Sequence, residues 1–339
     1  MNHTILMPDI VQDTIQSPEL EVRPVLSFVI PCYNEEDNVA AICAAVTAEA
    51  ERHVASHEII LIDNGSTDAT RQIIRQLCEE DRRIKAIFNS RNFGQMRSPT
   101  HAIFQTTGQA VIGLCADFQD PPNMIGQFVQ HWKEGKRIVL AQRRSEKTSF
   151  IMRIVRDSCY NLLAKYADYP AIPNVTGFGL YDRKVVDAVA AWNEPEPFFR
   201  GMIIETGYSV QLIPYDRPDR IAGKTKNNFR TLLDFALASM ASSTRNLLRL
   251  PLLWAPFFGL IGAILMVCSG LSLFWNGPAI LIAIVALQFG FFSVLLGFLG
   301  LLGIQIRTIS DRSRQTPLVI EEERLNFTEK NMLRTEHGA

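Results

Sequence analysis

The feature that most constrains the fold is a repeated unit of a short apolar run, a polar loop and a helix-like stretch. Five such runs lie at residues 25–30, 59–62, 84–88, 110–115 and 137–141. Their length and apolar character fit strands that are buried on both faces of a sheet. The alternation with helical stretches predicts a doubly wound, mostly parallel α/β sheet, and residues 176–181 are expected to return to it as a further strand.

The loop after the fourth run carries the clearest chemistry. Its sequence is Asp117-Phe118-Gln119-Asp120-Pro121-Pro122, and the two prolines end the strand and begin a helix near Asn123. Asp117 and Gln119 therefore lie at the carboxyl end of a strand, where open α/β sheets bind their ligands. Their oxygen atoms suit a hard divalent cation, which usually brings a phosphate with it. An acidic residue after a strand can also be a simple helix cap.

Composition excludes other classes. The 339 residues carry a net charge of −1, so nothing in the composition indicates a nucleic-acid-binding protein with a basic face. The six cysteines are scattered, without a CxxC pair or metal-ligand spacing, which indicates reduced thiols. Residues 1–23 lack an apolar core and carry acids and prolines, so we expect a flexible N-terminal arm rather than a signal peptide.

Two uncharged runs lie near the C-terminus, at 251–274 and 279–306, with a turn between them. At about 1.5 Å per residue, each is long enough to cross a hydrocarbon core of about 30 Å, so they predict two transmembrane helices. Residues 230–250 are amphipathic and are expected to lie in the membrane interface, with an ordinary core helix as the alternative.

Arginines flank this predicted hairpin on both sides, and its turn carries no charge. The positive-inside rule then predicts a multi-pass protein of the inner (plasma) membrane, with the catalytic domain and both termini cytoplasmic. The tail, residues 307–339, contains a possible short strand at 317–320 followed by a charged, disordered end.

A basic run precedes the amphipathic segment and contains few acids. It is either a solvated surface or a contact for phosphates or lipid headgroups. Its members are Arg217, Arg220, Lys224, Lys226 and Arg230.

Four ordered segments resemble the motifs of family-2 glycosyltransferases with the GT-A fold. They are residues 31–36, 62–68, 91–95 and 116–122. With the predicted hairpin, they make the chain similar to the polyprenyl-phosphate glycosyltransferases over about residues 24–320. The resemblance implies a GT-A catalytic domain at 24–229, followed by the amphipathic helix, the hairpin and the tail.

The resemblance also implies roles for individual residues. Asp117 and Gln119 would hold Mg²⁺ or Mn²⁺ against the donor diphosphate. Asp117, Arg220 and Lys226 would be the catalytic residues. Arg220 and Lys226 would bind either the donor phosphates or the acceptor phosphate, and Arg153 or Arg156 would meet the acceptor phosphate. The expected donor-binding residues are Pro31, Tyr33, Glu35, Asp63, Ala116, Asp117, Gln119 and Arg143.

The chain departs from the family pattern at four positions. Cys115 stands where the first acid of an Asp-Ala-Asp motif is usual, and Asn64 replaces the second acid of Asp-Asp-Gly-Ser. Gly177 and Gly179 occupy positions where the family often has an aspartate and an arginine. The Cys115 substitution puts the metal affinity or metal choice in doubt.

The implied function is transfer of a sugar from UDP or GDP to a polyprenyl phosphate such as undecaprenyl phosphate. A phosphomonoester has a second pKa near 6, so it carries a nucleophilic oxygen without a general base. We therefore expect in-line attack with inversion, and two helices per chain favour a homo-oligomer around the lipid. The alternatives are a glycosyltransferase with another lipid or glycan acceptor, and a catalytically weak scaffold that binds nucleotide sugars.

Overall fold

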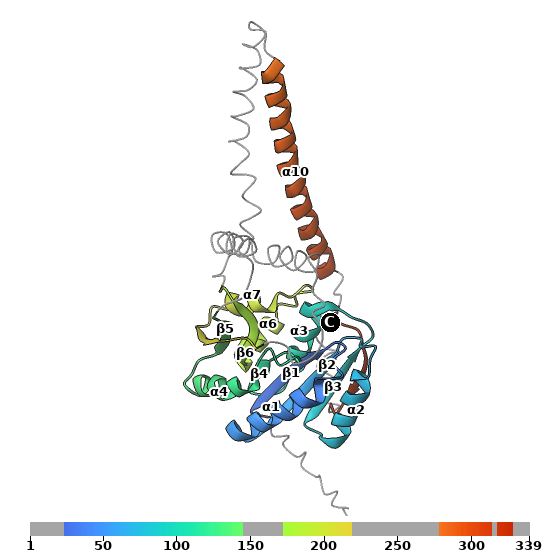
Figure 1. The fold of residues 1–339 in the computed structure, drawn as a ribbon, viewed down its shortest axis with the longest axis vertical. Helices are drawn as coiled ribbons and strands as arrows, with labels where there is room; N and C mark the ends of the chain where they lie inside the picture. Colours follow the sequence, from blue (N-terminus) through green and yellow to red (C-terminus); the bar gives the residue numbers. More distant parts are fainter. Residues whose placement is uncertain (1–23, 145–171, 219–277, 314–316, 328–339) are drawn as a thin grey trace, which may run out of the picture.

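The computed structural model describes residues 24–144, 172–218, 278–313 and 317–327. In this part of the chain, eight strands form one sheet in the order β7-β5-β6-β4-β1-β2-β3-β8 (Figure 1). The strands are β1 (Leu26–Cys32), β2 (His57–Asp63), β3 (Ile84–Asn89), β4 (Ala110–Gly113), β5 (Ile138–Arg143), β6 (Val175–Asp182), β7 (Val210–Tyr215) and β8 (Glu321–Leu325). The helices are α1 (Val39–His53), α2 (Thr70–Glu80), α3 (Gly94–Phe104), the 3₁₀ turn η1 (Pro122–Met124), α4 (Ile125–Lys133), α6 (Arg183–Ala190), α7 (Phe199–Glu205) and α10 (Pro278–Ser313).

The sheet is mixed rather than uniformly parallel. Strands β4, β1, β2 and β3 run parallel to one another, as the strand–helix alternation predicts. Strand β6 runs antiparallel to both of its neighbours, β4 and β5, while β7 runs parallel to β5. The carboxyl ends of β4, β1 and β2 therefore lie side by side at one edge.

Helices cover both faces of the sheet. Below it in Figure 1 lie α1, α2 and α4, whereas α3, α6 and α7 lie above it. Alternate residues of one strand enter different cores: Ile59 and Leu61 pack with the first set of helices, and Ile60 and Ile62 pack with the second. All four are fully buried, which explains why this strand is a continuous apolar run. The predicted double winding is confirmed.

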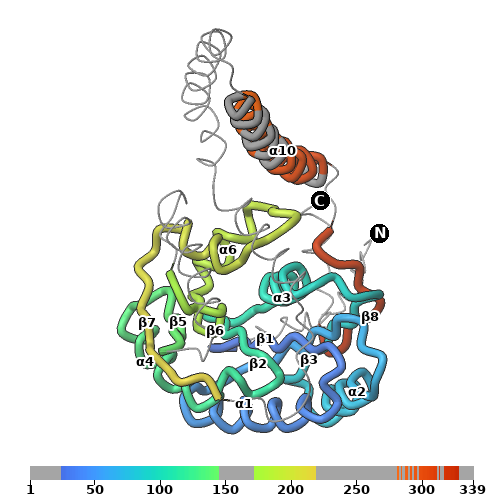
Figure 2. The backbone as a smooth tube through the Cα atoms, turned by 45° about the horizontal axis from the view of Figure 1, so that its top comes forward, coloured from blue at the N-terminus to red at the C-terminus, as the bar shows by residue number. Residues whose placement is uncertain are grey.

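The short strand predicted at 317–320 is misplaced. The strand is β8, Glu321–Leu325, which begins directly after the predicted segment ends and pairs antiparallel with β3. Figure 2 shows it in red at the β3 edge of the sheet. Its sequence, Glu-Glu-Glu-Arg-Leu, is too charged to predict a strand locally, so the pairing depends on partners elsewhere in the fold.

The transmembrane prediction requires correction. The second predicted span, 279–306, lies within α10, which points away from the sheet in Figure 1. Across the described residues, no helix combines the length and the apolar character needed to cross a membrane. This finding contradicts the prediction of a multi-pass inner-membrane protein.

Several predicted segments lie outside the described residues. They are the N-terminal arm at 1–23, the amphipathic segment at 230–250 and the first predicted span at 251–274. The structure contains one chain, so the expected homo-oligomer stays a prediction.

Candidate donor site at the carboxyl edge of the sheet

Three polar loops meet where β4, β1 and β2 end. These are the segments at 31–36, 63–68 and 114–120, which lie at the carboxyl ends of the three adjacent strands. Because the strands are parallel, the loops gather at one edge of the sheet. The structure thereby brings most of the expected donor-binding residues to one region.

The loops after β1 and β2 are joined by hydrogen bonds. Asn34, with a positive φ of 55°, donates its backbone N–H to Ser66 Oγ at 2.9 Å. Its side-chain Oδ1 accepts from the Thr67 backbone N–H at 2.8 Å. The Glu35 backbone N–H donates to Thr70 Oγ1 at 2.8 Å. The two loops therefore form one connected surface, and the left-handed backbone at Asn34 suits asparagine.

The expected donor residues of the first loop occupy different positions. Pro31 lies within β1, paired with Ile62 of β2. Tyr33 is half-buried in the loop itself. The Glu35 carboxylate accepts from Asn38 Nδ2 at 2.8 Å, just before α1 begins, so it also helps to fix the start of that helix.

Asp63 is turned into the protein. Its side chain is fully buried, and its carboxylate accepts from the backbone N–H groups of Gly65 at 3.1 Å and Ser66 at 3.2 Å. It also accepts from Arg71 Nε at 2.7 Å. These contacts hold the loop after β2 in shape. The sequence indicated the position of Asp63 but neither its inward orientation nor its arginine partner.

Asn64 occupies the position where the family usually has a second acid. Its Nδ2 donates to Asn92 Oδ1 at 2.9 Å and to the Gly94 carbonyl at 3.3 Å. Its Oδ1 accepts from the Phe93 backbone N–H at 2.9 Å and from Asn89 Nδ2 at 3.1 Å. A side chain that both donates and accepts is required here, which explains the asparagine.

The loop after β4 is a tight turn. Phe118 has a φ of 59°, and Asp117 Oδ1 accepts from the Gln119 backbone N–H at 3.2 Å. Asp117 and Ala116 are both buried, while Gln119 is partly exposed. Asp120 stabilises the turn, because its carboxylate accepts a hydrogen bond from the Cys115 backbone N–H at 3.0 Å.

Asp120 is buried, and this burial raises its pKa above the ordinary value for an aspartate. The Tyr215 hydroxyl lies 3.5 Å from Asp120 Oδ1 and also hydrogen-bonds Arg143 at the end of β5. Arg143 is thus linked to the Asp117 turn through Tyr215 and Asp120. Sequence reasoning assigned no role to Asp120 or Tyr215.

The Asp117 turn suits a divalent cation that takes only a few of its ligands from the protein. Within the described ranges, no group of three or more histidine, cysteine, aspartate or glutamate side chains could hold a metal. A Mg²⁺ ion in a phosphate site usually takes one or two carboxylates, with substrate phosphates and water completing its shell. Asp117 would supply one carboxylate and Gln119 an amide oxygen, a donor set that is compatible with a metal–diphosphate pair.

Backbone conformation and close contacts explain why glycine occupies two positions in β6. Gly177 has a φ of 97°, in the left-handed region, and a Cβ there would lie 3.4 Å from Arg200 Cγ. A Cβ at Gly179 would lie 2.3 Å from the Val139 carbonyl oxygen. An aspartate at 177 would therefore need a strained backbone, and an arginine at 179 would clash with the neighbouring strand.

The remaining predicted residues cannot be placed. Arg153, Arg156, Arg220 and Lys226 lie outside the described residues. Their expected contacts with the acceptor phosphate therefore stay predictions.

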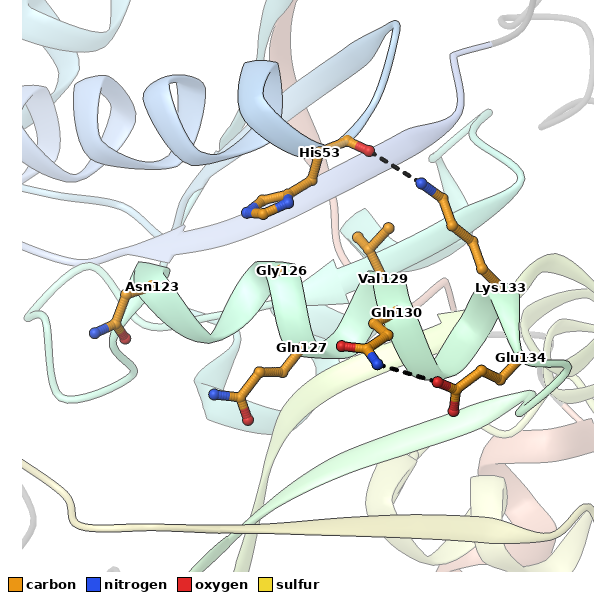
Figure 3. Close-up of a pocket in the computed structure, with 8 residues that line it drawn as sticks. All are labelled: His53, Asn123, Gly126, Gln127, Val129, Gln130, Lys133 and Glu134. Atoms are coloured by element: carbon orange, nitrogen blue, oxygen red, sulfur yellow. Dashed lines mark hydrogen bonds between the residues drawn. The ribbon is translucent and has the colours of Figure 1, made fainter.

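A groove of about 620 Å³ lies between the end of α1 and α4 (Figure 3). The His53 ring covers Gly126, where a Cβ would approach within 2.6 Å of Nε2, and Lys133 Nζ donates to the His53 carbonyl at 3.3 Å. None of the expected donor or metal residues lines this groove. It is therefore separate from the loop cluster.

The sheet and the loops at its carboxyl edge place the chain among Rossmann-like α/β proteins. The model of glycosyl transferase family 2 matches residues 27–189. An uncharacterized glycosyltransferase of Synechocystis, sll0501, is 35% identical over 218 residues, which cover 64% of this chain and 69% of the relative. The chain belongs to glycosyltransferase family 2, and it is a transferase.

Two further relatives are similar to a larger part of this chain. YkcC of Bacillus subtilis, an uncharacterized glycosyltransferase, is 30% identical over 92% of this chain and 97% of its own length. The prophage bactoprenol glucosyl transferase homolog of Escherichia coli K12 is 31% identical over 70% of this chain and 77% of its own.

Proposed function

We propose that the protein transfers a sugar from a UDP- or GDP-sugar to a polyprenyl phosphate, such as undecaprenyl phosphate, with inversion at the anomeric carbon. The observation that carries the proposal is the Asp117–Gln119 turn beside the joined loops after β1 and β2. The bactoprenol glucosyl transferase homolog among the relatives supports the acceptor class.

The donor would bind along the loop cluster in its GT-A arrangement. Tyr33 offers a ring face for the nucleobase, Glu35 an acceptor for a hydroxyl group, and Asp63 fixes the loop that faces them. Asp117 and Gln119 would hold Mg²⁺ or Mn²⁺. A cation held there would neutralise charge on the leaving diphosphate.

The acceptor side needs cationic groups rather than a base. A phosphomonoester already carries a nucleophilic oxygen at neutral pH, because its second pKa is near 6. The absence of an acid at Gly177 is compatible with such an acceptor, whereas an alcohol would require a proton acceptor. Arg153, Arg156, Arg220 and Lys226 are the proposed phosphate-binding residues.

The test is a screen of UDP- and GDP-sugars against C55 polyprenyl phosphate with the purified full-length protein, with and without EDTA. We expect metal-dependent transfer that forms a β-linked product from an α-linked donor. Asp117→Asn should lower the rate by about 10²-fold or more, the scale of losing a group that stabilises transition-state charge. An α-linked product would refute the inverting mechanism.

The same screen separates the alternatives. Transfer to diacylglycerol or a glycan, with none to polyprenyl phosphate, would favour the other acceptor classes. A catalytically weak scaffold would bind a nucleotide sugar without turnover, and its Asp117→Ala variant would bind equally well.

A further inference from the structure

The C-terminal strand brings three acidic side chains onto the edge of the sheet. Glutamates 321–323 of β8 each meet a cationic or histidine side chain from the helices beside β3. Glu321 lies 2.5 Å from His101 Nε2, Glu322 accepts from Arg71 Nη1 at 2.9 Å, and Glu323 pairs with Arg75. Arg71 and Arg75 lie one turn apart on α2, so one helix face carries two parallel ion pairs to β8.

Arg71 differs from Arg75 in what else it contacts. Its guanidinium donates to Asp63 Oδ2 at 2.7 Å, to the Asn89 carbonyl at 2.6 Å and to Glu322 at 2.9 Å. The Asp63 side chain is fully buried, whereas that of Glu322 is 58% exposed. The planar guanidinium group of Arg71 thus links the buried Asp63, in the loop after β2, to the exposed Glu322 of β8.

Asp63 connects Arg71 to the loop at 63–68, which is part of the proposed donor site. Its carboxylate accepts from the backbone N–H groups of Gly65 and Ser66, and Ser66 Oγ in turn accepts from the Asn34 backbone N–H. A continuous hydrogen-bonded path therefore runs from Glu322, through Arg71 and Asp63, to both loops of the proposed donor site.

We propose that Arg71 is a positioning residue for the nucleotide donor, and that Glu322 of the C-terminal strand orients its guanidinium. This inference rests on the proposed function, because it assigns the loop at 63–68 to the donor. Arg71 acts through Asp63 and the loop backbone, while β8 supplies the third contact that keeps the guanidinium group in place.

The chain offers a matched control. Glu323 lies on the same strand and pairs with the same helix through Arg75, whose guanidinium also stacks over Phe88 at 4.5 Å. Among the contacts that the structure describes for Arg75, none involves Asp63. Glu323→Ala therefore removes a comparable ion pair from β8 and leaves the path to the donor loop intact.

The experiment compares full-length Glu322→Ala, Glu323→Ala and Arg71→Lys by two measurements. The first is amide hydrogen exchange of the 63–68 segment without ligand. The second is binding of UDP and GDP, with KM and kcat for any donor sugar that is turned over. For Glu322→Ala we expect exchange and donor KM to rise about two- to fivefold, as for a partly exposed ion pair, with kcat nearly unchanged. Arg71→Lys should have the larger effect, and Glu323→Ala almost none.

Equal behaviour of the two alanine variants would overturn the proposal, and so would faster exchange without any change in nucleotide affinity or donor KM. Failure of the proposed function has a different outcome. A wild-type protein that neither binds nor turns over any nucleotide would refute that function, while the exchange comparison would still decide whether Glu322 orders the loop.

Discussion

At the scale of single residues, Asn64 shows how a departure from a family pattern becomes understandable in the fold. It donates to two oxygen atoms and accepts from two N–H groups. An aspartate would place a carboxylate oxygen against Asn92 Oδ1 and the Gly94 carbonyl, without a proton to share. The asparagine therefore serves the loops beneath the donor site rather than the donor itself.

Asn64→Asp should destabilise the protein by about 1–3 kcal/mol, because a buried hydrogen-bonding site loses its donor. Urea unfolding at pH 7 would measure the change. Asn193→Asp, at an exposed position, is the control and should leave the midpoint unchanged. An Asn64→Asp variant as stable as the wild type would contradict the role assigned to the Nδ2 group.

Gly177 gives a second prediction. Gly177→Asp should lower stability by about 1–2 kcal/mol, the cost of a left-handed backbone for a residue with a Cβ, and should not raise transfer activity. Thermal unfolding would measure the loss of stability. Gly135→Ala is a useful comparison because Gly135 has a similar φ of 93° with no atom within 4 Å of the added Cβ. A Gly177→Asp variant of normal stability and higher turnover would show that an acid is tolerated there.

The sequence predicted that Asp63, Asp117 and Gln119 lie at the carboxyl edge of the sheet, because each comes at or shortly after the end of an apolar run. It could not predict that the Asp63 carboxylate faces inward, since its partners include Arg71 of α2 and the backbone of its own loop. Chain direction sets the position of a residue after a strand, whereas side-chain orientation depends on contacts that form only in the folded protein.

At the scale of elements, β8 shows the limit of local patterns. The predicted strands of the sheet centre are apolar and were found where expected, while β8 is mainly glutamate and was expected to be disordered. It forms a strand because residues more than 200 positions earlier supply its hydrogen bonds and opposite charges. No short sequence window contains that information.

The stability contribution of β8 should depend on pH through Glu321. Burial alone would raise the pKa of this carboxyl group, but hydrogen bonds from His101 and Arg324 lower it to about 2. A folded-state pKa below the unfolded value stabilises the protein above the unfolded value, and this contribution is lost as pH falls through the folded one. The relevant window therefore lies between about pH 5 and pH 2.

Glu321→Gln should lower the free energy of unfolding by about 1–3 kcal/mol at pH 7. The difference from the wild type should shrink as the pH falls from 5 toward 2. Urea unfolding at a series of pH values measures both proteins, with Glu323→Gln as the control for removing one charge from the same strand. A difference that stays constant across that range would contradict the assigned cause.

At the scale of the whole molecule, the sheet is completed by a strand from the far end of the chain. The parallel half of the sheet was predictable from strand–loop–helix alternation, and so were its two helical layers. The antiparallel insertion of β6 between β4 and β5 was not, because alternation records the order of elements and not the direction in which they pair.

Removal of the last strand should expose the β3 edge. A chain ending at residue 316 should unfold at lower temperature and associate, because an unpaired edge strand offers its backbone groups to other chains. Size-exclusion chromatography with light scattering would detect the association. A chain ending at residue 327 keeps β8 and is the matched control. Equal behaviour of the two truncations would show that β8 does not protect the edge.

The late position of β8 in the chain also has a consequence for biosynthesis. Residues 24–144 include β1, β2 and β3 and emerge from the ribosome long before Glu322 does. Until Glu322 has been synthesised, Arg71 lacks the partner that β8 provides. This edge of the sheet can therefore be completed only after β8 has been made, and a protein truncated before β8 would lose a contact at Arg71, 251 residues upstream of Glu322.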